Sequence, residues 1–141
     1  MIKDKEGDFF RTKFINYYDI NVNNIELILS NEIKSSDILS ISLIDCESKI
    51  ILGYVGNDIF EKETILNNDI TYKLNKNIKL LNSSYHLEEI MTTCDKYIYV
   101  NVILEWQRKL MLYAIYDTSQ TNIGLIKNRL KNIIKDIQDV L

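Results

Sequence analysis

Apolar residues concentrate in two strand-like runs near the C-terminal end of the chain, at residues 97–104 and 110–116. A strand with one wet face alternates between apolar and polar residues, whereas these two runs are apolar on both faces. We therefore expect a sheet with helices on both faces. The faces of the first run are Ile98, Val100, Val102 and Leu104 against Tyr97, Tyr99, Asn101 and Ile103; those of the second are Leu110, Leu112, Ala114 and Tyr116 against Met111, Tyr113 and Ile115.

Three further runs complete a predicted antiparallel sheet of five strands. Residues 38–45 and 49–55, on either side of the turn at 46–48, predict a hairpin. Residues 87–94 predict a third strand, in which the adjacent acids Glu88 and Glu89 suit a sheet edge better than its centre. In the first strand, alternation places Leu39, Ile41 and Leu43 on one face and Ile38, Ser40, Ser42 and Ile44 on the other.

Three segments carry apolar residues at helical spacing. The first starts at Asn21 or Asn23, either of which can cap it, and runs to about Glu32. The second begins at the polar cap 67–69 and ends near residue 81, and the third follows Asn122; residues 59–66 are ambiguous. The apolar faces are Val22, Ile25, Leu29 and Ile33; Ile70, Leu74, Ile78 and Leu81; and Ile123, Ile126, Leu130, Ile133, Ile137 and Val140. The predicted class is α+β, with the order αββαβββα.

The N-terminal 20 residues stand apart from this pattern as a tail or extension of a domain at residues 21–141. We expect Met1 to Asp8 to be disordered. The segment from Phe9 to Tyr18 carries aromatic residues at helical spacing, which would suit a short helix. It would alternatively be an arm whose aromatic side chains dock on the domain or on a partner.

Composition narrows the class of protein. The chain of 141 residues has 46% hydrophobic and 26% charged residues, as ordinary globular domains do, and a formal net charge of −3. Without a basic excess, nucleic acid is a poor candidate partner. No apolar run approaches the ~20 residues of a membrane span, and the charged N-terminus is not followed by a signal-peptide core. We therefore expect a cytoplasmic protein without membrane insertion.

No group of residues predicts catalysis, a metal site or a cofactor. His86 is the only histidine and has no nucleophile near it in the sequence. Glu88 and Glu89 would point to opposite faces of a strand and could not converge on one substrate. Cys46 and Cys94 lack ligand spacing for zinc, so we expect two small buried side chains. The chain is therefore not expected to be an enzyme.

Two features remain open between a structural and a binding role. Lys127, Lys131 and Lys135, here called the lysine ridge, lie opposite the apolar face of the last helix. They would form a solvated outer face, or they would meet an acidic partner or an anionic membrane. Trp106, beside Arg108 in a turn, would be an interface anchor or would lie on the protein's own surface.

The element order and several segments resemble the Roadblock/LC7 family. The similarity covers roughly residues 22–141, and residues 122–127, with the sequence NIGLIK, resemble the family most closely. The other segments that carry the resemblance are residues 24–29, 41–45, 50–53 and 112–116. The turn at 46–49 departs from the Asp-Gly turn that is usual at this place.

The resemblance implies a non-enzymatic module that dimerises through an edge strand and the middle helix, with itself or with a paralogue. The dimer would present a shared platform to a small Ras-like GTPase or a motor assembly. The implied dimer edge is Leu87, Glu89, Ile90 and Met91, and the implied partner-facing residues of the middle helix are Tyr72, Lys73, Lys76 and Lys79.

A second interpretation is a sensor domain of the PAS or profilin-like kind. It shares the division into two and three strands and would bind a small ligand between sheet and helices. Such a protein would need a pocket on the sheet into which polar groups such as Asn101 or Tyr99 are directed.

Overall fold

The computed structural model describes the backbone of residues 2–4, 8–14, 22–35, 38–104, 110–119 and 122–140. Side chains are described for residues 24–34, 38–57, 59–104, 110–119 and 122–140. The turn with Trp106 and Arg108 lies outside these residues.

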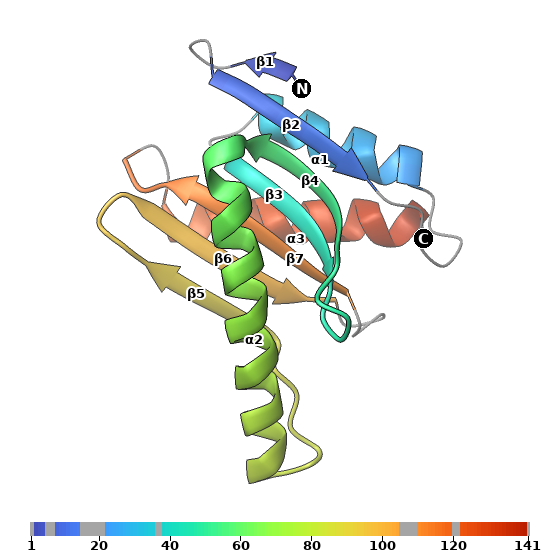
Figure 1. Ribbon diagram of the computed structural model, residues 1–141, viewed down its shortest axis with the longest axis vertical. Helices are drawn as coiled ribbons and strands as arrows, with labels where there is room; N and C mark the ends of the chain where they lie inside the picture. Colours follow the sequence, from blue (N-terminus) through green and yellow to red (C-terminus); the bar gives the residue numbers. More distant parts are fainter. Residues whose placement is uncertain are drawn as a thin grey trace.

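One antiparallel sheet runs through the molecule, with its strands in the spatial order β1-β2-β4-β3-β7-β6-β5. Helix α2 lies across one face, and α1 and α3 lie side by side on the other (Figure 1). The predicted five-stranded sheet with helices on both faces and the order αββαβββα are therefore confirmed, from α1 to α3. The elements are β1 Ile2–Asp4, β2 Asp8–Phe14, α1 Val22–Ser35, β3 Ile38–Asp45, β4 Ile51–Asn57, the 3-10 turn η1 Asp58–Phe60, α2 Glu61–Leu81, β5 Glu89–Thr93, β6 Tyr97–Ile103, β7 Leu110–Asp117 and α3 Ile123–Val140.

The N-terminal segment adds two strands to this sheet, so the predictions of a disordered tail and a short helix were wrong for residues 2–4 and 8–14. The rest of both predicted segments, residues 1, 5–7 and 15–18, lies outside the described residues. Strand β2 pairs with β4, from Phe10 opposite Asn57 to Phe14 opposite Gly53, and β1 pairs with β2. A short isolated helix is marginal in water, whereas the edge of β4 offers a row of backbone hydrogen-bonding groups. The alternative of an arm docked on its own domain agrees with this arrangement.

The larger core lies between the sheet and the helices α1 and α3. As predicted, Ile25, Leu29 and Ile33 of α1 are buried, and so are the inward residues of β7 and, apart from the half-buried Val102, those of β6. Asn122 caps α3, because its side-chain oxygen accepts the backbone N–H of Leu125 at 2.9 Å. The buried apolar residues of α3 are Ile126, Leu130, Ile133 and Ile137.

The smaller core lies under α2 and contains Ile44, Met111 and Ile115 of the sheet. The predicted faces of β3 are wrong at its start: Ile38 packs in the larger core, whereas Leu39 packs against the smaller one. The register against β7 shifts between Ile38 and Ser40, and such a bulge reverses the faces on either side of it.

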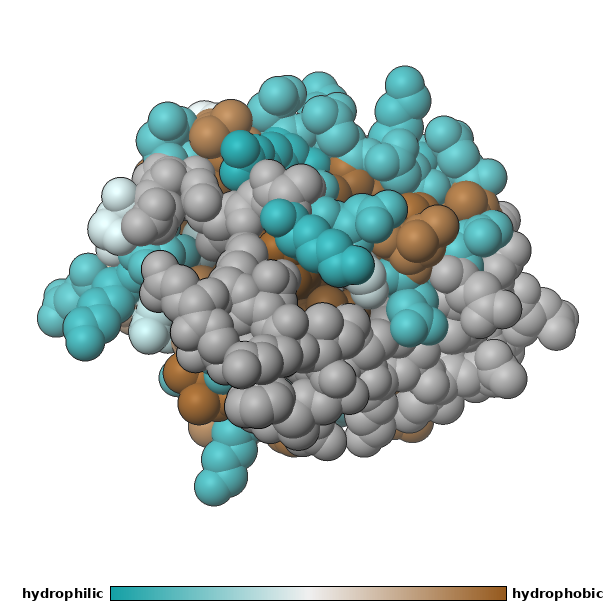
Figure 2. All heavy atoms as spheres, turned by 90° about the horizontal axis from the view of Figure 1, so that it is seen from above, coloured by the Kyte–Doolittle hydropathy of each residue, from teal (hydrophilic) through white to brown (hydrophobic). Residues whose placement is uncertain are grey.

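Seen from above, hydrophilic side chains cover much of the described surface, with hydrophobic patches between them (Figure 2).

Candidate protein-interaction surface

Helix α2 is longer than the sequence predicted. It begins at Glu61, so Asn68, which was expected in the cap, is buried inside the helix. Phe60 stands before the first turn without a side-chain cap and is buried in the smaller core. Glu61 and Glu63 in the first turn favour this start, because carboxylates stabilise the positive end of the helix dipole.

The face of α2 that lies on the sheet is polar. Its buried residues are Thr64, Asn68 and Thr71. The hydroxyl of Thr64 donates to the backbone carbonyl of Phe60 at 2.9 Å, and that of Thr71 donates to the side-chain oxygen of Asn67 at 3.4 Å. These bonds satisfy the helix internally, so they add little attraction between α2 and the sheet.

A side-chain hydrogen bond between two asparagines joins α2 to the sheet. The amide nitrogen of Asn101, in β6, donates to the side-chain oxygen of Asn67 and also approaches the sulfur of Met111 at 3.5 Å. The amide oxygen of Asn101 is buried and has no hydrogen-bond partner among the described residues. An unsatisfied buried acceptor costs about 1–3 kcal/mol, and this cost offsets part of the free energy with which the contact binds α2 to the sheet.

A row of tyrosines on the sheet extends this interface. The rings of Tyr99 and Tyr113 stack with centroids 6.5 Å apart, and Tyr97 meets Phe60 edge-on at 5.2 Å. Burial, followed by the nearby carboxylate of Glu63, raises the pKa of Tyr99 to about 12. Burial also raises the pKa of Tyr113, so both rings stay neutral at physiological pH.

One exposed flank of α2 is apolar. Ile70 is 63% exposed, and Leu80 and Leu81 at the end of the helix are 84% and 81% exposed. Helical spacing places four of the exposed residues on one flank. This set, here called the outer stripe, consists of Leu66, Ile70, Leu74 and Leu81. The predicted apolar face of this helix therefore does not lie against the sheet; only Ile78 of that face is half-buried against the smaller core.

The opposite flank of α2 is basic. Tyr72 lies between two ammonium groups, with Lys49 at 4.6 Å and Lys76 at 4.7 Å from its ring centre. The carboxylate of Asp69 pairs with Lys49 at 2.8 Å and with Lys73 at 2.9 Å. Hydrogen bonds from Lys49 and then Lys73 lower the pKa of Asp69, which stays ionised. Tyr72, Lys73 and Lys76 thus form one cluster beside the β3–β4 turn.

The fourth residue of the predicted partner-facing set, Lys79, is exposed further along α2. Lys49 was not among the residues predicted for this surface. It stands in the β3–β4 turn, with a positive φ of 63°. The turn is closed by Asp45, whose carboxylate accepts the backbone N–H groups of Glu47 and Ser48 at 2.9 Å each. The signal that could have identified Lys49 as part of this surface is the turn that contains it, which is anchored by the carboxylate of Asp45 and lies next to the second helix.

Strand β5 is the outermost strand beyond β6, and no described strand pairs with its other side. Of the four residues predicted for the dimer edge, Glu89 is exposed, and Ile90 and Met91 are half-buried. Leu87 lies before β5 and is buried in the smaller core. Its side chain is therefore not part of the exposed edge, and the strand is shorter than predicted.

The remaining chemical candidates stay separate in the fold. His86 is exposed, and no three His, Cys, Asp or Glu side chains of the described residues come together as metal ligands. Cys46 is buried, but Cys94 is exposed, contrary to prediction, because it follows β5 in the turn to β6. Within the described part of the chain, no helix has the length and apolar character of a membrane span.

Solved structures share this architecture. MglB of Myxococcus xanthus superposes with a TM-score of 0.70 at 14% identity, over 89% of this chain and 93% of that chain. The gliding protein MglB of Thermus thermophilus gives 0.67 at 12% identity, over 90% and 94%. A Roadblock/LC7 domain of Streptomyces avermitilis gives 0.63 at 8% identity, over 80% and 93%. The chain has the Roadblock/LC7 fold.

The Roadblock/LC7 fold is shared here without close sequence similarity. No protein-family model matches the sequence, and no curated protein matches it either. The superpositions support the fold, but with identities of only 8% to 14% the function has to be argued from the surface of this chain.

Proposed function

We propose that this chain is a non-enzymatic regulator or scaffold of a small Ras-like GTPase and that it acts as a dimer. The observation that carries the proposal is the inversion of α2, which turns a polar face to its own sheet and an apolar face outward. Exposed apolar patches of this kind mark interaction sites in soluble proteins.

The outer stripe is exposed, and no described strand pairs with the outer side of β5. Both features favour a second copy of the chain as the cover. In a two-fold dimer, the same surface patch meets itself. Antiparallel pairing of β5 with its symmetry mate would extend the sheet across the two copies and satisfy the free backbone groups of the edge. The two α2 helices would then lie near the two-fold axis, where Ile70 and Leu74 would be covered.

The basic flank of α2 is the proposed contact for the GTPase. This flank does not include the outer stripe, so a dimer formed through the outer stripe would leave its residues accessible. They are Tyr72, Lys73, Lys76 and Lys79. Paired lysines around an aromatic ring suit an acidic protein surface, and complementary charge of this kind raises association rates. The fold shared with MglB and the resemblance to the Roadblock/LC7 family support a GTPase as the partner class.

Two measurements test the proposal. Light scattering on the eluting protein should give the mass of a dimer at micromolar concentration, and a strict monomer would contradict the dimer. Purified Ras-like GTPases from the same genome, loaded with GDP or a non-hydrolysable GTP analogue, should bind the wild-type chain. The double variant Lys76→Glu with Lys79→Glu should lose binding, while the matched control Lys34→Glu with Lys96→Glu should retain it. Equal losses in both variants, or no binding by the wild type, would rule out the basic flank.

The sensor interpretation finds less support. Asn101, one of the groups expected to be directed into a ligand pocket, is buried and bonded to Asn67 under α2. Tyr99 is half-buried and stacked on Tyr113. The described cavity lies elsewhere, between α3 and the strands β5 and β6.

A further inference from the structure

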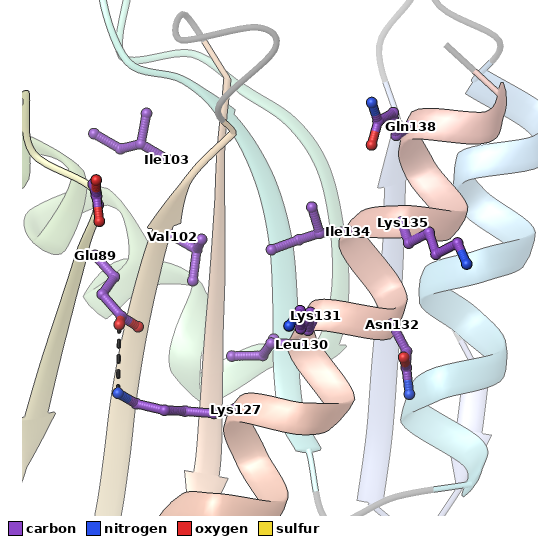
Figure 3. A pocket seen from close by; sticks show the side chains of 11 residues that line it. Glu89, Val102, Ile103, Lys127, Leu130, Lys131, Asn132, Ile134, Lys135 and Gln138 are labelled. Carbon is purple, nitrogen blue, oxygen red and sulfur yellow. Dashed lines mark hydrogen bonds and ion pairs between the residues drawn. The ribbon is translucent and has the colours of Figure 1, made fainter.

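A cavity of about 680 Å³ lies along α3, on the face of the sheet opposite α2. We call it the α3 groove. Figure 3 shows its two walls, which are helix α3 and the strands β5 and β6. Its lining residues are Glu88, Glu89, Val102, Ile103, Lys127, Leu130, Lys131, Asn132, Ile134, Lys135 and Gln138.

The floor of the α3 groove is apolar. Val102 of β6 and Ile134 of α3 pack against the larger core but remain only partly buried, and the buried core residue Leu130 lies near them (Figure 3). Helices α1 and α3 cover the middle of the sheet, and no helix of the described residues lies above this strip beside β5 (Figure 1). An apolar strip on a two-sided sheet is the surface on which a further helix packs.

The two rims carry opposite charges. On the strand side stand Glu88 and Glu89, and on the helix side stands the lysine ridge of Lys127, Lys131 and Lys135. Lys127 and Glu89 pair across one end of the groove at 3.4 Å. Among the described residues, Lys131, Lys135 and Glu88 have no ion pair, so their charges remain available to an occupant. Like charges four residues apart on a helix repel each other slightly, and carboxylates of a partner would relieve that repulsion.

The shape of the α3 groove favours a helix over a strand. Its α3 wall runs from Lys127 to Gln138, which is about 17 Å or three helical turns. Strand addition needs free backbone groups, but on this face β5 and β6 already pair with each other, from Glu89 opposite Val102 to Thr93 opposite Ile98. Side-chain docking of an amphipathic helix needs no backbone partner.

From these observations we propose that the α3 groove binds an amphipathic helix of a partner protein. Its apolar side would rest on Val102, Leu130 and Ile134, carboxylates on one flank would meet Lys131 and Lys135, and basic residues on the other flank would meet Glu88. The site lies within one chain and does not depend on the dimer or on GTPase binding.

The probe is a synthetic helical peptide of about 14 residues, with leucines on one side, glutamates on one flank and lysines on the other. Its control has serines in place of the leucines. Titration into the isotope-labelled protein should shift amide signals of β6 and α3 and leave those of α2 unchanged. The exposed pair Lys131→Glu with Lys135→Glu should weaken binding about tenfold or more. The matched pair Lys62→Glu with Lys79→Glu, on the opposite face, should not.

Charge exchange gives the decisive comparison. A peptide whose glutamate flank is replaced by lysines should bind the Lys131→Glu, Lys135→Glu protein better than the wild type. Circular dichroism of the variants checks that both are folded. Equal binding by the serine control, signal shifts centred on α2, or no shifts at millimolar peptide would each overturn the proposal. So would cosedimentation with phosphatidylserine vesicles in the absence of peptide binding, which would assign the lysine ridge to a lipid surface.

Discussion

Replacing Ile70 by alanine should weaken the proposed dimer without weakening the fold of a single chain. Ile70 belongs to the outer stripe and makes no part of either core of the described chain. Its removal therefore leaves no cavity in the monomer, whereas the proposed dimer would lose two apolar side chains at its centre. The change separates association from folding, which most core substitutions cannot do.

The expected size of the effect follows from exposure. Ile70 is 63% exposed, and full burial of an isoleucine side chain contributes roughly 1.5–3 kcal/mol. Covering the exposed part of Ile70 then contributes about 1–2 kcal/mol per copy. A two-fold interface contains the residue twice, so the variant should lose about 2–4 kcal/mol of association free energy. This corresponds to a rise in Kd of roughly 30- to 1,000-fold.

Sedimentation equilibrium over a range of concentrations gives Kd for the wild type and for Ile70→Ala. The matched control is Leu27→Ala, because Leu27 is 61% exposed but lies in α1, on the other face of the sheet. Urea unfolding of the monomer, at concentrations below Kd, should give equal free energies for Ile70→Ala and the wild type within about 0.5 kcal/mol.

Two results would refute this reasoning. If Ile70→Ala and Leu27→Ala change Kd equally, the outer stripe is not the dimer contact. If Ile70→Ala destabilises the monomer by more than about 1 kcal/mol, the residue is packed within its own chain, contrary to its exposure.

Two other sites give further expectations. A side chain at Gly56 would place Cβ 2.5 Å from both Cα and Cβ of Ser40, at a φ of +155°, so Gly56→Ala should lower the free energy of unfolding by about 2–4 kcal/mol in urea titrations. Gly124→Ala is the matched control, because a Cβ added at Gly124 meets an ordinary contact of 3.5 Å. It should raise the free energy of unfolding by about 0.5–1 kcal/mol. Equal effects of the two substitutions would contradict the geometry. Burial raises the pKa of the Cys46 thiol to about 12, so iodoacetamide at about pH 7–10 should leave Cys46 unmodified in the native protein. Exposed Cys94 should react, and mass spectrometry of the digested protein would show any labelling of Cys46 that contradicts this.

The same pKa shift gives a pH dependence of stability. The thiol of Cys46 is favoured in its neutral form by the fold, so its contribution is fully present below the ordinary value of 9.0. That contribution should decline as the pH rises from 9.0 toward about 12, because the unfolded chain ionises first. Replacing Cys46 by serine or alanine should remove this part of the alkaline decline.

Strands β6 and β7 could be predicted from the sequence down to the face of each residue. Both alternating sets are apolar there, so the strand period is unambiguous and cover on both sides follows. The face of α3 could be predicted for the same reason, since Ile126, Leu130 and Ile133 recur at helical spacing and are buried. These elements bury most of their apolar side chains within their own chain, so the period of the hydrophobic residues alone determines their orientation.

The orientation of α2 could not be predicted in this way. Periodicity shows that Ile70 and Leu74 share a flank of the helix, but not whether that flank meets the chain's own sheet or another molecule. The polar residues Thr64 and Asn68 decide the matter in the fold, because the helix satisfies the Thr64 hydroxyl internally and can bury it at little cost. The N-terminal aromatics raise a similar ambiguity, since Phe10 and Phe14 fit both a helix and one face of a strand.

The two edges of the sheet are treated differently, and this difference bears on assembly. Beyond β4 the chain adds β2 and then the three-residue strand β1, and a short outermost strand offers few groups for pairing with another chain. Beyond β6 the chain adds only β5 among the described strands, and no described strand pairs with its outer side. The proposed assembly through the sheet would therefore use one edge, and it would give a closed two-fold pair rather than an open row of sheets. Because the buried oxygen of Asn101 is unsatisfied under α2, contacts of a second copy with the outer stripe would also help to hold this helix in place.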